Sequence, residues 1–206
     1  MKITILNGSP EPSAFEGTLA QIKSVLEAQN HSVTLIDLRH LSLRYCIGCW
    51  GCWVKTPGQC TAQDASIEID QAVINSDFTL WAAPLKMGFP SALLKMALDK
   101  HIPLIHPYME VVHNEAHHLK RYHRYPRVGL LVGKEENTDE ADLGIVTDIF
   151  SRTALNLKSC LEFSLTTTTS VEEIAQRITD LHPTYLPLPK RLPATTGMSI
   201  PPPKRL

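Results

Sequence analysis

The stretch from Lys2 to Thr18 reads K-I-T-I-L-N-G-S-P-E-P-S-A-F-E-G-T. Its first five residues form a short apolar run, and a Gly/Ser loop follows before a helix that we expect to begin near Thr18. Thr18 and Gln21 have the spacing of a capping box at the start of that helix. A strand that leads through such a loop into a helix gathers unpartnered N–H groups at the positive end of the helix dipole. The stretch therefore predicts an anion-binding strand–helix unit.

The residue types in this loop indicate which anion it would accept. The loop has neither G-x-G-x-x-G, the fingerprint of dinucleotide sites, nor the G-K-[ST] of nucleotide-hydrolysing P-loops. The hydroxyl groups of Ser9, Ser13 and Thr18 suit a single terminal phosphate. The alternative is an ordinary turn between a strand and a helix, with no ligand.

Apolar strands and amphipathic helices alternate along the rest of the chain. The predicted strands cover residues 2–6, 32–36, 77–83, 127–133 and 161–165, and the predicted helices lie near 66–75, 90–101, 138–150 and 170–181. Pro90 is expected in the first turn of its helix. Strands that are apolar on both faces and separated by helices predict an α/β fold, a parallel sheet with helices on each side.

Two segments interrupt this alternation. Residues 102–126 are rich in His, Tyr and Arg and predict a hairpin or an excursion over the carboxyl edge of the sheet. Residues 182–206 are rich in proline and predict an extended or disordered tail. The predicted organisation is therefore one domain, residues 1–181, followed by a C-terminal tail.

The bulk composition excludes several classes of protein. With 206 residues the chain suits one well-buried domain, and its net charge of -1 argues against nucleic-acid and membrane-surface partners. It contains no apolar run of membrane-spanning length and no signal-peptide pattern. We therefore expect a cytoplasmic protein whose five cysteines are thiols or metal ligands rather than disulfides.

The loop Pro84–Pro90 follows a predicted buried strand that ends at Pro84. Ligands in open parallel sheets bind at the carboxyl ends of strands, where this loop would lie. Gly88 permits close backbone approach, and Lys86 adds positive charge. An apolar surface for a planar ring comes from Leu85, Met87 and Phe89. The alternative is a tight turn whose apolar residues face the core.

Four cysteines lie within fifteen residues, and Cys46, Cys49, Cys52 and Cys60 follow C-x2-C-x2-C-x7-C. This spacing suits a [4Fe–4S] cluster, because short spacers let successive thiolates converge on one cube. Zinc is less favoured, since its sites more often use two separated pairs. The alternatives are buried structural cysteines or redox-active thiols. The histidines between His101 and His123 are interpreted as a polar loop or subunit contact rather than a metal site.

Several motifs together resemble the flavodoxin-like NADPH-dependent FMN reductases, a superfamily that includes the iron–sulfur flavoproteins. They are I-L-N-G-S-P at 5–10, C-I-G-C at 46–49, P-x-x-x-G at 84–88 and L-K-x-x-x-D-K-x-I-P-L at 94–104. The resemblance covers about residues 1–181 and implies a flavodoxin-like three-layer sandwich with a five-stranded parallel sheet. Two departures are Glu11, where relatives often carry a basic residue, and Leu85-Lys86, where an aromatic residue is common.

The resemblance also implies the cofactor and the residues that hold it. FMN would be held at its phosphate by Ser9, Pro10, Ser13, Gly17 and Thr18, and at its isoalloxazine ring by Pro84, Leu85, Lys86, Met87 and Gly88. The expected activity is electron transfer from NAD(P)H to a quinone, a flavin or a similar small-molecule acceptor, in a homodimer or homotetramer. The flavin would carry the chemistry, so no catalytic acid or base is predicted. The alternatives are an electron carrier with a [4Fe–4S] cluster, and a flavin-free scaffold suggested by Glu11.

Overall fold

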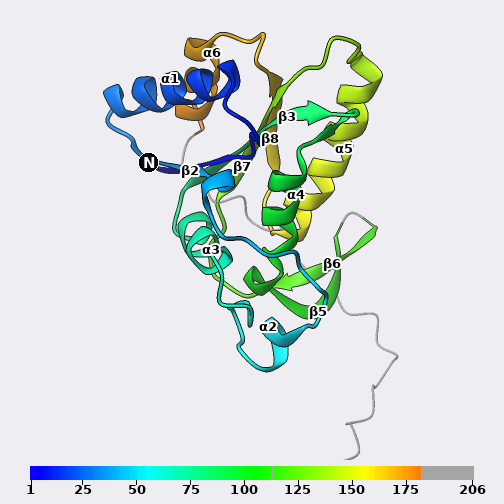
Figure 1. The fold of residues 1–206 in the computed structure, drawn as a ribbon. Helices are drawn as coiled ribbons and strands as arrows, with labels where there is room; N and C mark the ends of the chain where they lie inside the picture. The colour runs from blue at the N-terminus through cyan, green and yellow to red at the C-terminus, as the bar shows by residue number, and fades with distance from the viewer. Residues whose placement is uncertain (113, 182–206) are drawn as a thin grey trace, which may run out of the picture.

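The computed structural model describes residues 1–112 and 114–181. Within them, a parallel sheet has the strand order β2-β1-β3-β7-β8 (Figure 1). Its strands are β1 (Lys2–Asn7), β2 (Ser32–Asp37), β3 (Phe78–Lys86), β7 (Arg127–Gly133) and β8 (Leu161–Thr166). This is the flavodoxin-like order, so the predicted α/β class and five-stranded sheet are confirmed.

Helices cover both faces of the sheet, as the two-sided apolar strands predict. On one face lie α1 (Ala14–Ala28) and α6 (Val171–Thr179), which pack with the sheet in one apolar cluster. A second cluster on the other face contains α3 (Ser66–Ile74), α4 (Ala92–Asp99) and α5 (Glu140–Asn156). Trp81 and Phe78 of β3 are among the largest fully buried side chains, since β3 is the central strand. The fold is the predicted three-layer sandwich.

Gly8 lets α4 pack closely against the end of β1. Its N–H donates to the Ala82 carbonyl of β3 at 2.7 Å, so the β1 ladder continues one residue beyond the strand. A Cβ atom at this position would lie 2.7 Å from the Cβ of Leu94, too close for any side chain. The hydroxyl of Ser91, the N-cap of α4, donates to the Gly8 carbonyl. The start of α4 is therefore fixed beside the loop that follows β1.

Two helix starts differ from the prediction. Helix α1 begins at Ala14 with Ser13 as its N-cap, so the capping box predicted at Thr18 and Gln21 is wrong. Pro10 and Pro12 precede Ser13 and favour a loop over a helix in this segment. Helix α4 begins at Ala92, and Pro90 lies not in its first turn but in the short strand β4 (Phe89–Pro90).

Strand β3 does not end at Pro84, as predicted, but continues to Lys86. Pro84 pairs with Gly133 at the last register position against β7, and beyond it β3 turns back antiparallel into β4. Met87 and Gly88 form the turn, with φ angles of 55° and 73°. Two left-handed residues between paired strands are typical of a type I′ hairpin. The predicted open loop is therefore a rigid two-residue turn.

The predicted hairpin is confirmed as β5 (Ile105–Val112) and β6 (Glu115–Lys120), which follow the short helix η2 (Ile102–Leu104). Its predicted position over the carboxyl edge is wrong. His117 of β6 donates a hydrogen bond from Nδ1 to the side-chain oxygen of Asn156 at 3.0 Å, at the end of α5 that leads into the start of β8. In Figure 1 the hairpin accordingly lies beyond the C-terminal end of α4, away from the β3–β4 turn.

The remaining segments are a loop and two short helices between β2 and α3. Helix η1 (Leu38–His40) follows β2, and α2 (Gly51–Val54) lies within the cysteine-bearing loop. The predicted tail, residues 182–206, lies outside the described residues. Among the helices of the described chain, none combines the length and apolar character that crossing a bilayer requires.

Candidate functional site

The segment between β1 and α1 is folded around its own polar side chains. The amide of buried Asn7 donates to Asp37 at 2.7 Å, and its carbonyl oxygen accepts the N–H of Ser9 at 2.9 Å. The Ser9 hydroxyl donates to the Glu11 carbonyl at 2.8 Å and lies 3.4 Å from the Ser13 hydroxyl. The structure thus brings together two of the predicted phosphate ligands, Ser9 and Ser13.

The N-terminus of α1 lacks a side-chain cap. Ser13 is the N-cap residue, but its side chain accepts no hydrogen bond from the first turn. The cap side chains of α4, α5 and α6, which are Ser91, Asp139 and Ser170, do accept such bonds from backbone N–H groups of the first turn. First-turn N–H groups without a cap attract an external anion, and the helix dipole adds to this attraction. The donor set at Ser13 therefore fits a phosphate group.

The other predicted phosphate ligands are placed less favourably. Gly17 and Thr18 lie one turn inside α1, and the Thr18 hydroxyl donates to the Ala14 carbonyl at 3.4 Å. Pro10 is exposed and has no N–H to offer, so only its shape contributes to the loop. The Glu16 carboxylate in the first turn is neutralised by the guanidinium of Arg39.

The β3–β4 turn is the second predicted contact region for a ring. Met87 is 98% exposed and Lys86 is also exposed, and a Cβ at Gly88 would meet no atom within 4 Å. Leu85 is 1% exposed and belongs to the core, as the tight-turn alternative proposed. Pro84 is half-buried, so its exposure is between that of buried Leu85 and that of exposed Lys86 and Met87. The face that the turn offers to a ligand is therefore made by Lys86, Met87 and Gly88.

Glu135 was not singled out from the sequence, yet it contacts this turn. It lies in the loop after β7, and its carboxylate accepts the N–H of Gly88 at 3.0 Å. Hydrogen bonds from the Gly88 and Met87 N–H groups, with the charge of Lys86, lower the pKa of Glu135. The turn thus presents two backbone donors to an acceptor. Such donors at an open, partly apolar turn suit the edge of a planar heterocycle.

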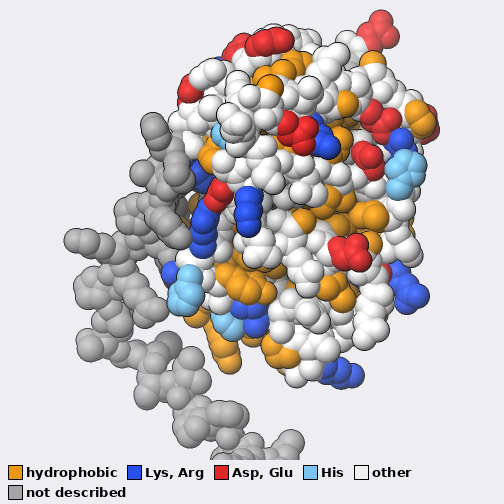
Figure 2. Space-filling model, turned by 90° about the vertical axis from the view of Figure 1, so that its left-hand side faces the viewer, with side chains coloured by type: hydrophobic (Ala, Val, Ile, Leu, Met, Phe, Trp, Pro, Cys, Tyr) orange, Lys and Arg blue, Asp and Glu red, His pale blue; other side chains and the backbone are white. Residues whose placement is uncertain are grey.

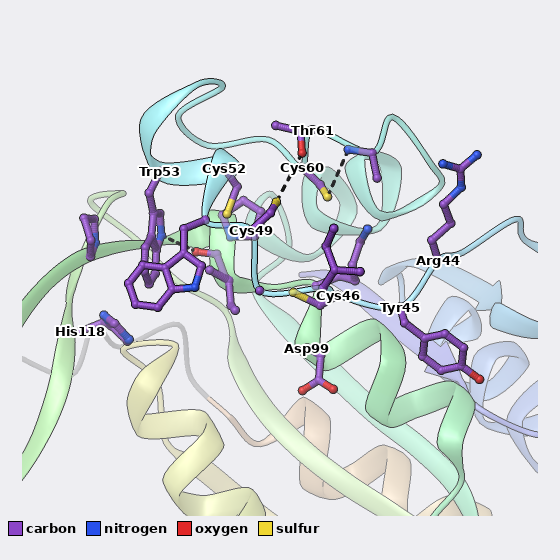
Figure 3. Close-up of a pocket in the computed structure, with 18 of the residues that line it drawn as sticks. Arg44, Tyr45, Cys46, Cys49, Cys52, Trp53, Cys60, Thr61, Asp99 and His118 are labelled. Carbon is purple, nitrogen blue, oxygen red and sulfur yellow. Dashed lines mark hydrogen bonds between the residues drawn. The ribbon is translucent and has the colours of Figure 1, made fainter.

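The four clustered cysteines line one cavity of about 710 Å³. In Figure 3, Trp53 and His118 lie on one side of the cysteines, and Arg44 and Tyr45 lie on the other. The indole N–H of Trp53 donates to the carbonyls of Ile102 and Ile105, at 3.1 and 3.0 Å. This pair of hydrogen bonds holds the cysteine loop against η2 and the hairpin.

The cysteine thiols are close enough to influence one another electrostatically. Burial, and then the neighbouring Cys60, Cys46 and Cys49, raise the pKa of Cys52 to about 11. Hydrogen bonds from the Gly51 N–H and the Thr61 hydroxyl lower the pKa of Cys49. The neighbouring sulfurs thus oppose the ionisation of Cys52 inside the shared cavity.

Over residues 1–112 and 114–181, no three Cys, His, Asp or Glu side chains converge tightly enough to hold a single metal ion. A single zinc ion draws its four ligands to about 2.0–2.3 Å. An iron–sulfur cube instead takes one thiolate at each iron and spreads its ligands farther apart. In the described residues the four cysteines therefore share a cavity without forming a single-ion site.

The two candidate regions lie at opposite ends of α4. At the start of α4, Ser91 bonds to Gly8, in the loop that joins β1 to α1. At its end, Asp99 and Lys100 line the cysteine cavity. An eight-residue helix spans roughly 12 Å, which sets the scale of their separation. Lys100 belongs to the sequence motif at 94–104, and the sequence alone assigns it no role.

The comparisons with known proteins agree with this geometry. An iron–sulfur flavoprotein of Methanocaldococcus jannaschii is 32% identical over 107 residues, which cover 50% of this chain and 53% of that protein. This chain therefore matches only about half the length of that curated relative. The fold resembles an NAD(P)H:quinone oxidoreductase from Methanothermobacter marburgensis, with a TM-score of 0.59 and 15% identity over 85% of this chain and 93% of the other.

A second solved structure with the same fold is an FMN-dependent NADH-azoreductase from Bacillus anthracis in complex with FMN. Its TM-score is 0.55, with 13% identity over 85% of this chain and 92% of the other. Residues 1–116 match the family described as NADPH-dependent FMN reductase, and this range is more than half of the chain. It contains the loop between β1 and α1, the β3–β4 turn and the four clustered cysteines. The chain belongs to the NADPH-dependent FMN reductase family.

Proposed function

We propose that this protein is an FMN-dependent oxidoreductase that passes electrons from NAD(P)H to a quinone, a flavin or a similar small-molecule acceptor. The observation that carries the proposal is the N-terminus of α1, where the Ser13 side chain caps no first-turn N–H and lies beside Ser9. It follows β1 at the carboxyl edge of a flavodoxin-like sheet, where such folds bind ligands. Membership of the family supports FMN as the cofactor.

The residues of the chain would bind and orient the flavin. Ser9, Ser13 and the first-turn N–H groups of α1 would hold the phosphate, with Gly17 leaving open space above them. The N–H groups of Met87 and Gly88, which bond to the Glu135 carboxylate, would face the edge of the ring. The ring would either replace this carboxylate as their acceptor or lie next to it. FMN supplies hydride and electron transfer when bound, and the protein supplies position and electrostatics.

The test is binding followed by turnover. Purified protein is mixed with FMN or with riboflavin, and flavin fluorescence reports the two dissociation constants. The proposal predicts tighter binding of FMN, because riboflavin lacks the phosphate. NADH or NADPH should then be oxidised only in the presence of FMN and an added quinone. Equal affinities for FMN and riboflavin would contradict the proposed phosphate site.

A second candidate function is favoured by the shared cavity of Cys46, Cys49, Cys52 and Cys60. These thiols would hold a [4Fe–4S] cluster, which supplies one-electron transfer and would make the protein an electron carrier. Iron and acid-labile sulfide are measured after anaerobic purification, with Cys52→Ser and Cys160→Ser compared. Cluster binding predicts iron and sulfide in the parent and in Cys160→Ser, and their loss in Cys52→Ser. A flavin-free scaffold, the third candidate, predicts a colourless protein that does not bind FMN.

We further propose a homodimer or homotetramer. Groups of hydrophobic side chains reach the surface in the lower half of the face shown in Figure 2. In the cysteine loop, Tyr45, Ile47, Trp50 and Val54 are all exposed. Apolar patches of this kind commonly mark contacts between proteins. Light scattering during size-exclusion chromatography would show the assembly, and a monomeric mass across the accessible concentrations would contradict it.

A further inference from the structure

Lys100 carries a buried positive charge at the wall of the cysteine cavity. It follows α4 as the C-cap residue, and its side chain is 2% exposed. Its ammonium lies 2.9 Å from the carboxylate of Asp64, whose side chain is 4% exposed. An ion pair so far removed from water is screened much less than a surface pair. The pair is therefore a weakly screened dipole, and Lys100 lines the cysteine cavity whereas Asp64 does not.

Asp64 holds this ammonium in a fixed position. One carboxylate oxygen accepts the N–H and the hydroxyl of Ser66, at 3.1 and 2.6 Å. The other accepts the N–H of Arg44 at 2.9 Å together with Lys100. Burial alone would raise the pKa of Asp64, but these hydrogen bonds outweigh it and hold that pKa well below its usual range. The carboxylate is therefore fully bonded and stays ionised.

The same ammonium reaches a cysteine. Lys100 and Cys60 both line the cavity, and Cys60, after Asp64, is among the groups that raise the pKa of Lys100. Asp99, the neighbouring acidic residue at the cavity, is exposed and paired with Lys95, so solvent screens its opposing charge. Lys100 thus directs an N–H donor and a buried positive charge at one of the four sulfurs.

We propose that Lys100, held by Asp64, is a positioning residue that sets the reduction potential of a cluster on the four cysteines. The proposal rests on the cluster proposed above. Reduction adds one electron, supplied by the reduced flavin or by a chemical reductant that is oxidised in turn, and no covalent bond is formed or broken. Hydrogen bonds to the sulfurs and nearby charge are the factors by which proteins adjust such potentials. The ammonium stabilises the more negative reduced state, so it raises the potential.

The test is an anaerobic redox titration of the cluster-bearing full chain, followed by electron paramagnetic resonance. Lys100→Met leaves the charge of Asp64 unopposed, and its potential should shift to clearly more negative values. Lys100→Arg keeps the charge and should restore the potential. Lys23→Met removes an exposed lysine of α1, on the opposite face of the sheet, and should leave the potential unchanged.

A double variant keeps the test decisive if Lys100→Met does not fold. Asp64→Asn with Lys100→Met removes both charges, and its potential should lie between those of the parent and of Lys100→Met. If every variant contains iron and sulfide at the parent level and the potentials are equal, the role of Lys100 is overturned while the cluster stands. If the parent itself binds no iron or sulfide on anaerobic reconstitution, the cluster is overturned, and this role of Lys100 with it.

Discussion

The carboxylate of Glu135 accepts the N–H of Gly88 at 3.0 Å and so ties the loop after β7 to the β3–β4 turn. The two residues are 47 positions apart in the chain. Their contact places a negative charge at the two-residue turn that we propose for the flavin ring. The β3–β4 turn therefore lies beside a negative charge that comes from a different loop.

Glu135→Gln should raise the reduction potential of bound FMN. The substitution keeps an oxygen that can accept the Gly88 N–H but removes the negative charge that disfavours electron uptake by the ring. Spectroelectrochemistry of the FMN-loaded protein measures the shift. Glu136→Gln, at the exposed neighbouring position, is the matched control. Equal potentials for the parent and Glu135→Gln would show that the carboxylate does not lie beside the ring.

Ser13→Ala should weaken FMN binding about ten- to a hundredfold and leave riboflavin binding unchanged. The expected size follows from the loss of a hydrogen bond to a charged group, about 1.5–3 kcal/mol. Fluorescence titration with both flavins measures the two affinities. Ser24→Ala, at an exposed position further along α1, should change neither. The same pair of titrations on Thr18→Ala tests the residue that the family resemblance implies.

Trp53→Phe should destabilise the fold by about 1–3 kcal/mol. It removes the indole N–H that bonds to two backbone carbonyls, each bond being worth about 0.5–1.5 kcal/mol. Trp50, its edge-to-face neighbour at 5.5 Å, is 63% exposed. Trp50→Phe should therefore change stability by less than about 0.5 kcal/mol. Urea unfolding of both variants provides the comparison, and equal losses would contradict the anchoring role of Trp53.

Much of the fold follows from local patterns, because the strands of the parallel sheet are short apolar runs and the helices that cover it have apolar faces. The errors lie where tertiary contacts override local signals. Helix α1 begins at Ala14 and not near Thr18, although its N-cap residue Ser13 forms no side-chain cap. Pro84 was predicted to end β3, but the strand continues through it. Pro84 lies at the last position of the ladder with β7, where its missing N–H is tolerated.

The candidate site was predictable only in part, for the same reason. Ser9 and Ser13 are close in sequence, so their meeting follows from the loop itself. Glu135 and Lys100 act through contacts with distant residues, Gly88 and Asp64, and no spacing rule connects these pairs. For Glu135 the one sequence signal was position, since the loop after β7 is among the segments that leave the carboxyl ends of strands. For Lys100 it was membership of the motif at 94–104.

Asp64→Asn should lower the free energy of unfolding by about 3–5 kcal/mol at pH 7, because it leaves the buried ammonium of Lys100 without its counter-charge. The lowered pKa of Asp64 means that its contribution is fully present above the ordinary aspartate pKa of about 3.9 and is lost as pH falls towards the folded value. The difference between the parent and the variant should therefore narrow below about pH 4.

Urea unfolding at several pH values between neutral and acidic measures this difference. Asp148→Asn, at an exposed position of α5, should match the parent throughout. A gap between the parent and Asp64→Asn that is constant down to the lowest pH would contradict the ionised pair.

The most direct test of the proposed function is an anaerobic absorbance titration of the FMN-loaded protein with NADPH and, separately, with NADH. The account predicts that one or both nicotinamides bleach the flavin absorption and that an added quinone restores it. A protein that retains no FMN after gel filtration, or whose bound FMN is reduced no faster than free FMN, would contradict it.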